Sequence, residues 1–280
     1  MSVAQALPST VGYTVAGWVG NVMSLTARGM RRQYDDNVTL AFGAPPPDLA
    51  RLRRRAFRNL AWNYLELATI PAMSRERLLA AGSIEGLDAA LAETARLGST
   101  GAVIAFAHVG NIEMLGHLGA RMPGNRLAVV VERVADAEMF DLISDLRTCH
   151  GLEVIPADEP RRILGAIRSG THLIVACDFD SLGGGLVTEL FGHPARLPVG
   201  AVRLALTCHA PLLMAEGWRD RDEDPSHFQA HVLGPLDVAR SGNREADARR
   251  AVEDLGRLLE RHVSAHPDQW LAFRDVWGQV

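Results

Sequence analysis

Short apolar runs rich in strand-forming residues recur along the chain between stretches with helical periodicity. The clearest runs are residues 102–107, 127–131, 152–156 and 172–177. Apart from Glu153 and His172, these runs are apolar on both faces, which is typical of strands buried inside a parallel sheet. Parallel strands must be joined by crossover segments, usually helices. The pattern therefore predicts an α/β fold, with a mainly parallel central sheet flanked by helices on both faces.

Stretches with helical periodicity separate these runs and end at glycine or proline residues. They are residues 48–70, 85–97, 111–121, 136–150 and 160–170, with two more that begin near residues 198 and 243. No linker is long enough to divide the chain. We therefore expect a single domain over residues 1–280, in which residues 1–70 form an N-terminal helical layer and residues 71–280 form the α/β core.

The charge pattern sets the N-terminal layer apart. Residues 1–27 carry no charged side chain, and eight arginines then face three aspartates between Arg28 and Arg58. A bilayer-spanning helix needs about 20 predominantly apolar residues, and this segment is too rich in polar residues and glycine. It also lacks the basic start of a secretory signal. An uncharged helix followed by an arginine cluster favours a peripheral position on a membrane surface, whereas the alternative is a solvated basic face.

Composition removes several classes of function. All 29 basic residues are arginine, so neither a Schiff-base lysine nor a phosphate-loop lysine is available. The three cysteines form no CxxC pair, which argues against a disulfide framework and suits the reducing cytoplasm. No recognisable basic module points to nucleic acid. Glu113 and His117 are four residues apart, but no HExxH motif accompanies them, so we expect no metal site.

The segment most informative about chemistry is HVGNIE, residues 108–113, where a predicted strand runs into a predicted helix. Ligands of α/β folds collect at the carboxyl ends of strands, where His108 lies, and Glu113 in the first helical turn could fold back to hold its imidazole in one tautomer. No GxSxG elbow supplies a nucleophile. His108 is therefore predicted to activate a hydroxyl or water that arrives from outside. The alternative is a loop histidine, with Glu113 favouring the helix dipole.

Four further segments accompany this one in a fixed order. The set comprises residues 108–113 (HVGNIE), 132–133 (ER), 146–156 (LRTCHGLEVIP), 189–200 (ELFGHPARLPVG) and 266–271 (HPDQWL). It resembles the bacterial lipid A lauroyl/myristoyl acyltransferase family, and within that family most of all the phosphatidylinositol mannoside acyltransferases. The resemblance covers residues 30–277, and its specificity lies in the ordered set.

The resemblance implies transfer of a fatty acyl group from acyl-CoA or acyl carrier protein to a hydroxyl of a glycolipid or lysophospholipid-type acceptor. The thioester is then a co-substrate, no cofactor is needed, and the protein is peripheral at the cytoplasmic face of the plasma membrane. His108 would be the general base, with Glu113 and Glu189 as the catalytic acids. The residues implied in substrate binding are Asn111, Arg133, Arg147, Asp178 and Arg196.

Three positions depart from the pattern of the mannoside enzymes. Glu113 stands where Asp is usual, Leu190 replaces the first of two phenylalanines, and His193 fills a position where an acid is common. These departures bear on the acceptor more than on the reaction. Two alternatives stay open: an acyl thioesterase, in which His108 activates water, and a non-catalytic lipid-binding membrane protein on the same fold.

Overall fold

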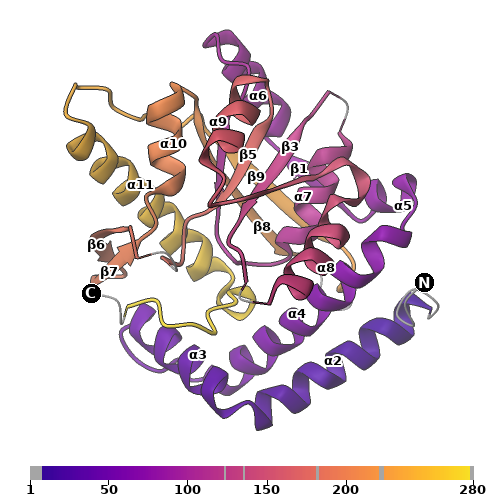
Figure 1. Ribbon diagram of the computed structural model, residues 1–280. Coiled ribbons are helices and arrows are strands. Elements are labelled where there is room, and N and C mark those ends of the chain that lie inside the picture. Colours follow the sequence, from indigo (N-terminus) through magenta and orange to yellow (C-terminus); the bar gives the residue numbers. More distant parts are fainter. Residues whose placement is uncertain (1–7, 123, 135, 181–182, 221–223, 278–280) are drawn as a thin grey trace.

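The computed structural model describes residues 8–122, 124–134, 136–180, 183–220 and 224–277. A seven-stranded sheet runs through the centre of the molecule in the order β1-β9-β8-β2-β5-β3-β4 (Figure 1). The strands are β1 (Gly82–Glu85), β2 (Val103–Phe106), β3 (Leu127–Val131), β4 (Glu153–Pro156), β5 (His172–Ala176), β8 (Leu212–Arg219) and β9 (Phe228–Leu233). Neighbouring strands are parallel except for β8 and β9. The predicted mainly parallel sheet is confirmed.

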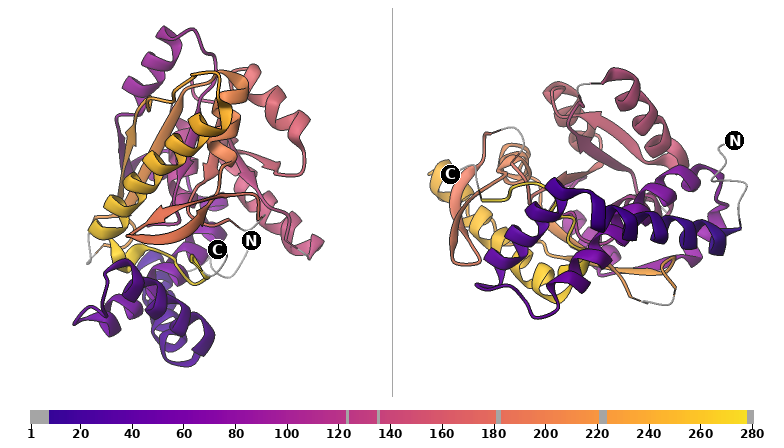
Figure 2. Two further views of the ribbon diagram at one scale, coloured as in Figure 1. Left: turned by 90° about the vertical axis from the view of Figure 1, so that its left-hand side faces the viewer. Right: turned by 90° about the horizontal axis from the view of Figure 1, so that it is seen from below.

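Helices cover both faces of the sheet and its carboxyl end (Figures 1 and 2). The α-helices are α2 (Ser9–Thr26), α3 (Arg28–Ala41), α4 (Leu49–Thr69), α5 (Arg75–Ala80), α6 (Leu87–Arg96), α7 (Ile112–Arg121), α8 (Ala137–Thr148), α9 (Pro160–Arg168), α10 (Gly200–Cys208) and α11 (Arg244–Ala265). Short 3-10 turns occupy Ile70–Ala72, Cys149–Gly151 and Pro267–Gln269. A separate antiparallel ribbon, β6 (Leu186–Leu190) with β7 (His193–Leu197), packs beside α11.

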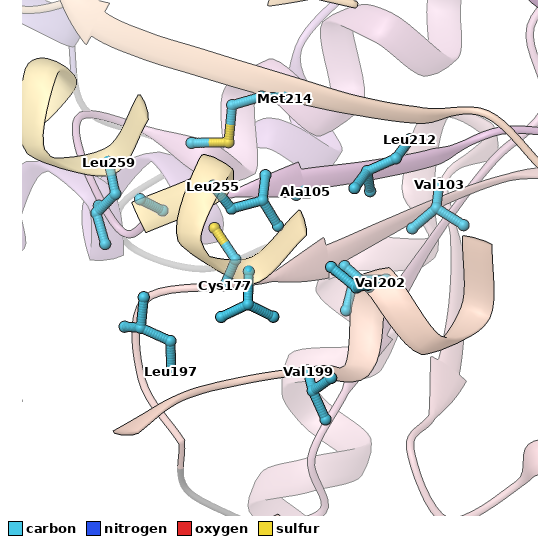
Figure 3. Close-up of a cluster of buried hydrophobic side chains, with 14 of the residues drawn as sticks. Val103, Ala105, Cys177, Leu197, Val199, Val202, Leu212, Met214, Leu255 and Leu259 are labelled. Atoms are coloured by element: carbon cyan, nitrogen blue, oxygen red, sulfur yellow. The ribbon is translucent and has the colours of Figure 1, made fainter. Parts of the chain in front are cut away.

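The strands are buried on both faces because their side chains alternate between two apolar clusters. In β2, Val103 and Ala105 join the cluster beneath α9, α10 and α11, whereas Ile104 joins the cluster beneath α6. Figure 3 shows the first of these clusters, with Leu255 and Leu259 of α11 lying over the sheet residues. The double-sided apolar pattern of the sequence is thus explained by burial.

Helices α2, α3 and α4 lie together at one end of the sheet (Figure 2). Helix α2 turns its small residues toward α4, so that a Cβ atom added at Gly20 would lie 2.6 Å from the carbonyl oxygen of Phe57. The opposite side of α2 carries exposed large apolar residues. In the described chain, no helix combines the length and the apolar character needed to cross a bilayer. Residues 1–7 of the uncharged segment lie outside the described residues.

Candidate active site

The register between β2 and β5 brings His108 and Asp178 together. The two strands are parallel with Phe106 opposite Ala176, and the two functional residues each follow two positions later. Asp178 Oδ1 lies 2.8 Å from Nδ1 of His108, and Asp178 Oδ2 accepts the backbone N–H of His108 at 2.8 Å. One carboxylate therefore fixes both the backbone and the ring at the carboxyl end of the sheet.

This pairing sets the protonation chemistry of His108. The Asp178 side chain is fully buried, while 34% of the His108 side chain is exposed. Because an ionised carboxylate only accepts hydrogen bonds, Nδ1 carries the proton of the neutral ring and Nε2 is the free acceptor. Burial alone lowers the pKa of His108, but the charge of Asp178 and its hydrogen bond outweigh burial and the nearby charge of Arg274, so the pKa is raised above its ordinary value. The ring can take a proton and remain stabilised as imidazolium.

Glu113 contacts a different partner from the one expected. Arg147 of α8 donates Nε to both carboxylate oxygens, at 3.0 and 2.9 Å, and Nη2 to Oε1. The expectation that Glu113 holds the imidazole is therefore corrected: Asp178 occupies Nδ1, and Glu113 faces α8 instead. Glu113 and Arg147 still line the same cavity as His108. The charge of Glu113 also contributes to raising the pKa of His108.

A buried ion pair lies directly beneath the loop that carries His108. Arg219, at the end of β8, donates to Glu66 of α4 through Nη1 at 2.8 Å and Nη2 at 2.6 Å, and both side chains are almost fully buried. Asn59 and Asn63 of α4 accept further hydrogen bonds from the guanidinium, at 3.0 and 2.6 Å. The hydroxyl of Tyr13 in α2 donates to Glu66. The charges are thus well compensated, as burial requires.

Hydrogen bonds to the backbone of residues 108–110 hold the loop from both sides. The N–H of Leu271 donates to the carbonyl of His108 at 2.8 Å, and the N–H of Gly110 donates to the carbonyl of Gln269 at 3.0 Å. From the other side, Nδ2 of Asn63 donates to the carbonyl of Gly110 at 2.8 Å. The loop is therefore fixed between α4 and the C-terminal segment.

The two residues before α7, Gly110 and Asn111, stabilise the conformation of this loop. Gly110 has a φ of 68°, and a Cβ atom there would lie 2.5 Å from the carbonyl oxygen of Gly217, so only glycine fits. Asn111 is fully buried and caps α7, with Oδ1 accepting the N–H of Met114 at 3.1 Å. Its Nδ2 donates to Glu66. Both ends of the Asn111 amide are thus bonded within the protein, which differs from the implied role in binding substrate.

A cavity of about 860 Å³ extends from His108 between α7 and the sheet. Its inner wall is apolar, with Ile104, Leu127 and Ile174 on the sheet and Leu115 and Gly116 on α7. Its polar lining residues are concentrated near the carboxyl end of the strands and include His108, Glu113, Glu132, Arg133, Arg147 and Arg274. Within the described residues, no cluster of three His, Cys, Asp or Glu side chains could hold a metal ion. The cavity is suited to a long apolar ligand with a polar end at His108.

Arg133 lines this cavity but is already engaged with acids. Its Nε lies 2.9 and 3.1 Å from the carboxylate oxygens of Asp158, and its Nη2 donates to Glu159 at 2.6 Å. Its guanidinium also lies over the ring of Phe140, 5.1 Å from the centroid. Any ligand of Arg133 would share it with these groups.

The ribbon carries the two remaining predicted site residues, Glu189 and Arg196, away from the cavity lining. Glu189 is exposed on β6, and Arg196 on β7 donates to the carbonyl of Gly185 at 3.2 Å. The N–H of Gly185 in turn donates to Asp180 at 2.8 Å. The structure therefore brings together His108, Asp178, Glu113, Arg133 and Arg147, but not Glu189 or Arg196.

Sequence reasoning missed the parts played by three residues, Asp178, Arg219 and Arg274. A signal existed for Asp178: it follows a buried strand at the same distance as His108 does, and parallel neighbours align such positions. Arg219 gave no local signal because its partners Glu66 and Asn59 are 153 and 160 residues away in the sequence. Arg274 lies in an irregular segment whose approach to His108 depends on the tertiary fold.

Comparison with known proteins identifies related sequences along nearly the whole chain. A phosphatidylinositol mannoside acyltransferase from Mycobacterium tuberculosis (strain CDC 1551 / Oshkosh) is 26% identical over 266 residues, which cover 89% of this chain and 78% of that protein. Another with the same name, from Mycolicibacterium smegmatis, is 22% identical over 279 residues, covering 98% and 87%. Residues 1–279 match the bacterial lipid A biosynthesis acyltransferase family as a whole. This chain, with its histidine–aspartate pair at the polar end of an apolar cavity, belongs to the bacterial lipid A biosynthesis acyltransferase family.

Proposed function

We propose that the protein transfers a fatty acyl group from acyl-CoA or acyl carrier protein to a hydroxyl of a glycolipid or lysophospholipid-type acceptor. The observation that carries this proposal is that the free side of His108, backed by Asp178, opens onto a long apolar cavity. The relatives named phosphatidylinositol mannoside acyltransferase support a glycolipid of that class as the acceptor.

In the proposed mechanism, Nε2 of His108 removes the proton of the acceptor hydroxyl as the oxygen attacks the thioester carbonyl. The tetrahedral intermediate then collapses and expels the thiolate, which takes the proton from the imidazolium. Asp178 keeps the ring in the required tautomer and stabilises its positive charge between these steps. General base catalysis of this kind contributes roughly 10²- to 10⁴-fold in rate.

The apolar wall of the cavity provides the space for the acyl chain. At about 0.8 kcal/mol for each buried CH₂, a palmitoyl chain offers on the order of 12 kcal/mol of gross burial. Placing the chain between α7 and the sheet leaves the thioester carbonyl near His108. Filling the cavity also excludes water from the histidine, which favours transfer to the acceptor over hydrolysis.

The outer face of α2 supports the proposal that the protein lies on the cytoplasmic face of the plasma membrane. This helix reverses the usual amphipathic arrangement, since small residues face α4 and large apolar residues face outward. Trp18 is 66% exposed and Leu25 70% exposed. The exposed row has helical spacing and consists of Val11, Val15, Trp18, Val22 and Leu25. Exposed apolar rows of this kind mark interaction surfaces.

The charges beside this surface support an anionic bilayer as its occupant. Exposed arginines follow on the adjoining helices, among them Arg28 and Arg32 on α3 and Arg51 and Arg54 on α4. Each basic residue near an anionic leaflet contributes about 1 kcal/mol to binding. In the proposed contact, the apolar side chains of α2 insert into the bilayer and the neighbouring arginines contact the lipid headgroups. Together they hold the protein at the membrane surface.

The membrane proposal is tested by co-sedimentation with vesicles of phosphatidylcholine, with and without phosphatidylinositol. We expect binding that requires the anionic lipid and falls at least tenfold in the double variant Trp18→Gln, Leu25→Gln. Leu97→Gln, a 55% exposed leucine just after α6, is the matched control. Equal binding by the double variant and the control would reject α2 as the contact.

The reaction itself is tested by incubating the purified protein with palmitoyl-CoA and a membrane lipid extract. Mass spectrometry should show a newly acylated lipid, and free CoA should appear in equal amount and only when the extract is present. CoA release at the same rate without lipid would identify a thioesterase. Vesicle binding with no release of CoA would identify a non-catalytic lipid-binding protein.

A further inference from the structure

The polar end of the cavity contains one guanidinium that differs from its neighbours. Arg133 and Arg147 are paired with acids, as described above. The side chain of Arg274, in contrast, is exposed and makes no hydrogen bond or ion pair with any other residue in the described ranges. A cationic fork that lines a substrate cavity without a protein partner is available to a ligand.

The backbone around Arg274 is held firmly. Nδ2 of Asn37, a buried residue of α3, donates to the carbonyl of Ala272 at 2.9 Å and to the carbonyl of Arg274 at 2.6 Å. Between them, the ring of Phe273 packs against Phe57 of α4, with centroids 4.6 Å apart. The N-terminal helices therefore fix this segment, and with it the backbone position from which the Arg274 side chain extends.

The same segment is tied directly to the catalytic histidine. The N–H of Leu271 donates to the carbonyl of His108 at 2.8 Å, only three residues before Arg274. The two side chains line one cavity, and the charge of Arg274 is near enough to lower the pKa of His108. A group bound to Arg274 would thus lie beside the reacting centre.

We propose that Arg274 binds a phosphate group of a substrate at the polar end of the cavity. The proposal rests on the proposed function, because the donor named there carries phosphate in its phosphopantetheine arm and a lysophospholipid-type acceptor carries phosphate in its headgroup. Arginine matches phosphate geometry with two parallel hydrogen bonds. Glu132, the residue after β3, also lines the cavity, and its negative charge disfavours a phosphate on its side. Bound phosphate would offset the charge of Arg274 and so favour proton uptake by His108.

Calorimetric titration tests the proposal without turnover. The probes form two pairs: coenzyme A with pantetheine, and dioctanoyl phosphatidylinositol with dioctanoylglycerol. The second member of each pair lacks phosphate. We expect Arg274→Gln to weaken binding of one phosphate-bearing probe about tenfold or more, with no change for its phosphate-free counterpart. The affected pair identifies the source of the phosphate, and Arg274→Lys, which keeps the charge without the fork, should give an intermediate loss.

Arg257→Gln, at an exposed arginine of α11 paired with Asp254, is the matched control and should bind all four probes as the unaltered protein does. Because Arg274 is exposed, its variants should keep the far-ultraviolet circular dichroism of the unaltered protein. Equal affinity of Arg274→Gln and the unaltered protein for both phosphate-bearing probes would overturn the proposal. Failure of the unaltered protein to transfer acyl groups would instead overturn the proposed function. The two failures can be told apart, because the binding comparisons do not depend on turnover.

Discussion

Asp178 bonds to His108 twice, with Oδ1 2.8 Å from the ring nitrogen Nδ1 and Oδ2 2.8 Å from the backbone nitrogen. A single buried carboxylate thereby sets the position, the tautomer and the proton affinity of the ring. The arrangement follows from the register of β2 and β5, so the geometry of the histidine–aspartate pair is set by the pairing of two strands in the sheet.

Replacing Asp178 by Asn should change the pH dependence of the reaction. The charge of Asp178 raises the pKa of His108 against the opposing effect of burial, so its loss lowers that pKa. Activity requires the neutral ring and is lost as the pH falls through the pKa. The acidic limb of kcat/KM should therefore move to lower pH, with kcat reduced roughly 100-fold or more because the tautomer is no longer fixed. An unmoved acidic limb would show that Asp178 does not act on the ring.

Glu113 and Glu189 offer a matched comparison of two acids. Glu113 lines the cavity and holds Arg147, whereas Glu189 is exposed on the ribbon. We expect Glu113→Gln to lower kcat on the order of 10-fold, because it weakens a charged hydrogen-bonded pair beside the base. Glu189→Gln should stay within about twofold, as substitutions at exposed positions usually do. A loss with Glu189→Gln as large as that with Glu113→Gln would support the catalytic role that the family resemblance implied for Glu189.

Features of the fold set by local residue patterns could be predicted from the sequence. The buried strands are recognisable because both faces are apolar. Several helix starts are marked by side chains that accept a backbone N–H three residues later, as at Asn111, Asp136 and Asn243. The position of His108 at the end of β2 follows from the same reading.

Features that depend on tertiary contacts could not be predicted. The β6–β7 hairpin turns at Phe191 and Gly192, both with positive φ, and Phe-Gly is a much weaker hairpin signal than Asn-Gly. The short strand β1 is a strand because it pairs with β9, which lies nearly 150 residues later in the sequence. The partner of His108 was misassigned for the same reason, since sequence proximity favoured Glu113 while strand pairing favours Asp178.

The buried pair beneath the loop gives a prediction about stability. Arg219→Leu leaves Glu66 charged, buried and without its main partner. The free energy of unfolding, measured by urea titration, should fall by about 3–5 kcal/mol. Arg257→Leu removes an exposed ion pair and should change it by less than about 1 kcal/mol. A loss for Arg219→Leu as small as for Arg257→Leu would mean that the pair does not stabilise the fold.

Because His117 is buried, we expect the free energy of unfolding to decrease in mild acid. Burial lowers its pKa to about 4, whereas the unfolded chain takes up the proton near the ordinary value of 6.5. The stability that its neutral form provides is therefore present above pH 6.5 and is lost as the pH falls toward 4. Between pH 7 and pH 5 this histidine should account for about 2 kcal/mol of the decrease in unfolding free energy.

Urea titrations of His117→Leu at the same two pH values should lack that share of the decrease. His209→Asn, at an exposed position with positive φ that asparagine tolerates, should retain the full decrease. The same pH dependence in His117→Leu as in the unaltered protein would assign the acid sensitivity to other groups.

The central claim, that His108 deprotonates the acceptor hydroxyl, is tested most directly by His108→Asn. Release of CoA from palmitoyl-CoA should be followed in the presence of membrane lipid, with circular dichroism confirming that the variant is folded. The account predicts that acceptor-dependent release falls by roughly 10²-fold or more, while binding of palmitoyl-CoA stays within a few-fold. A folded His108→Asn protein that transfers acyl groups at the unaltered rate would contradict it.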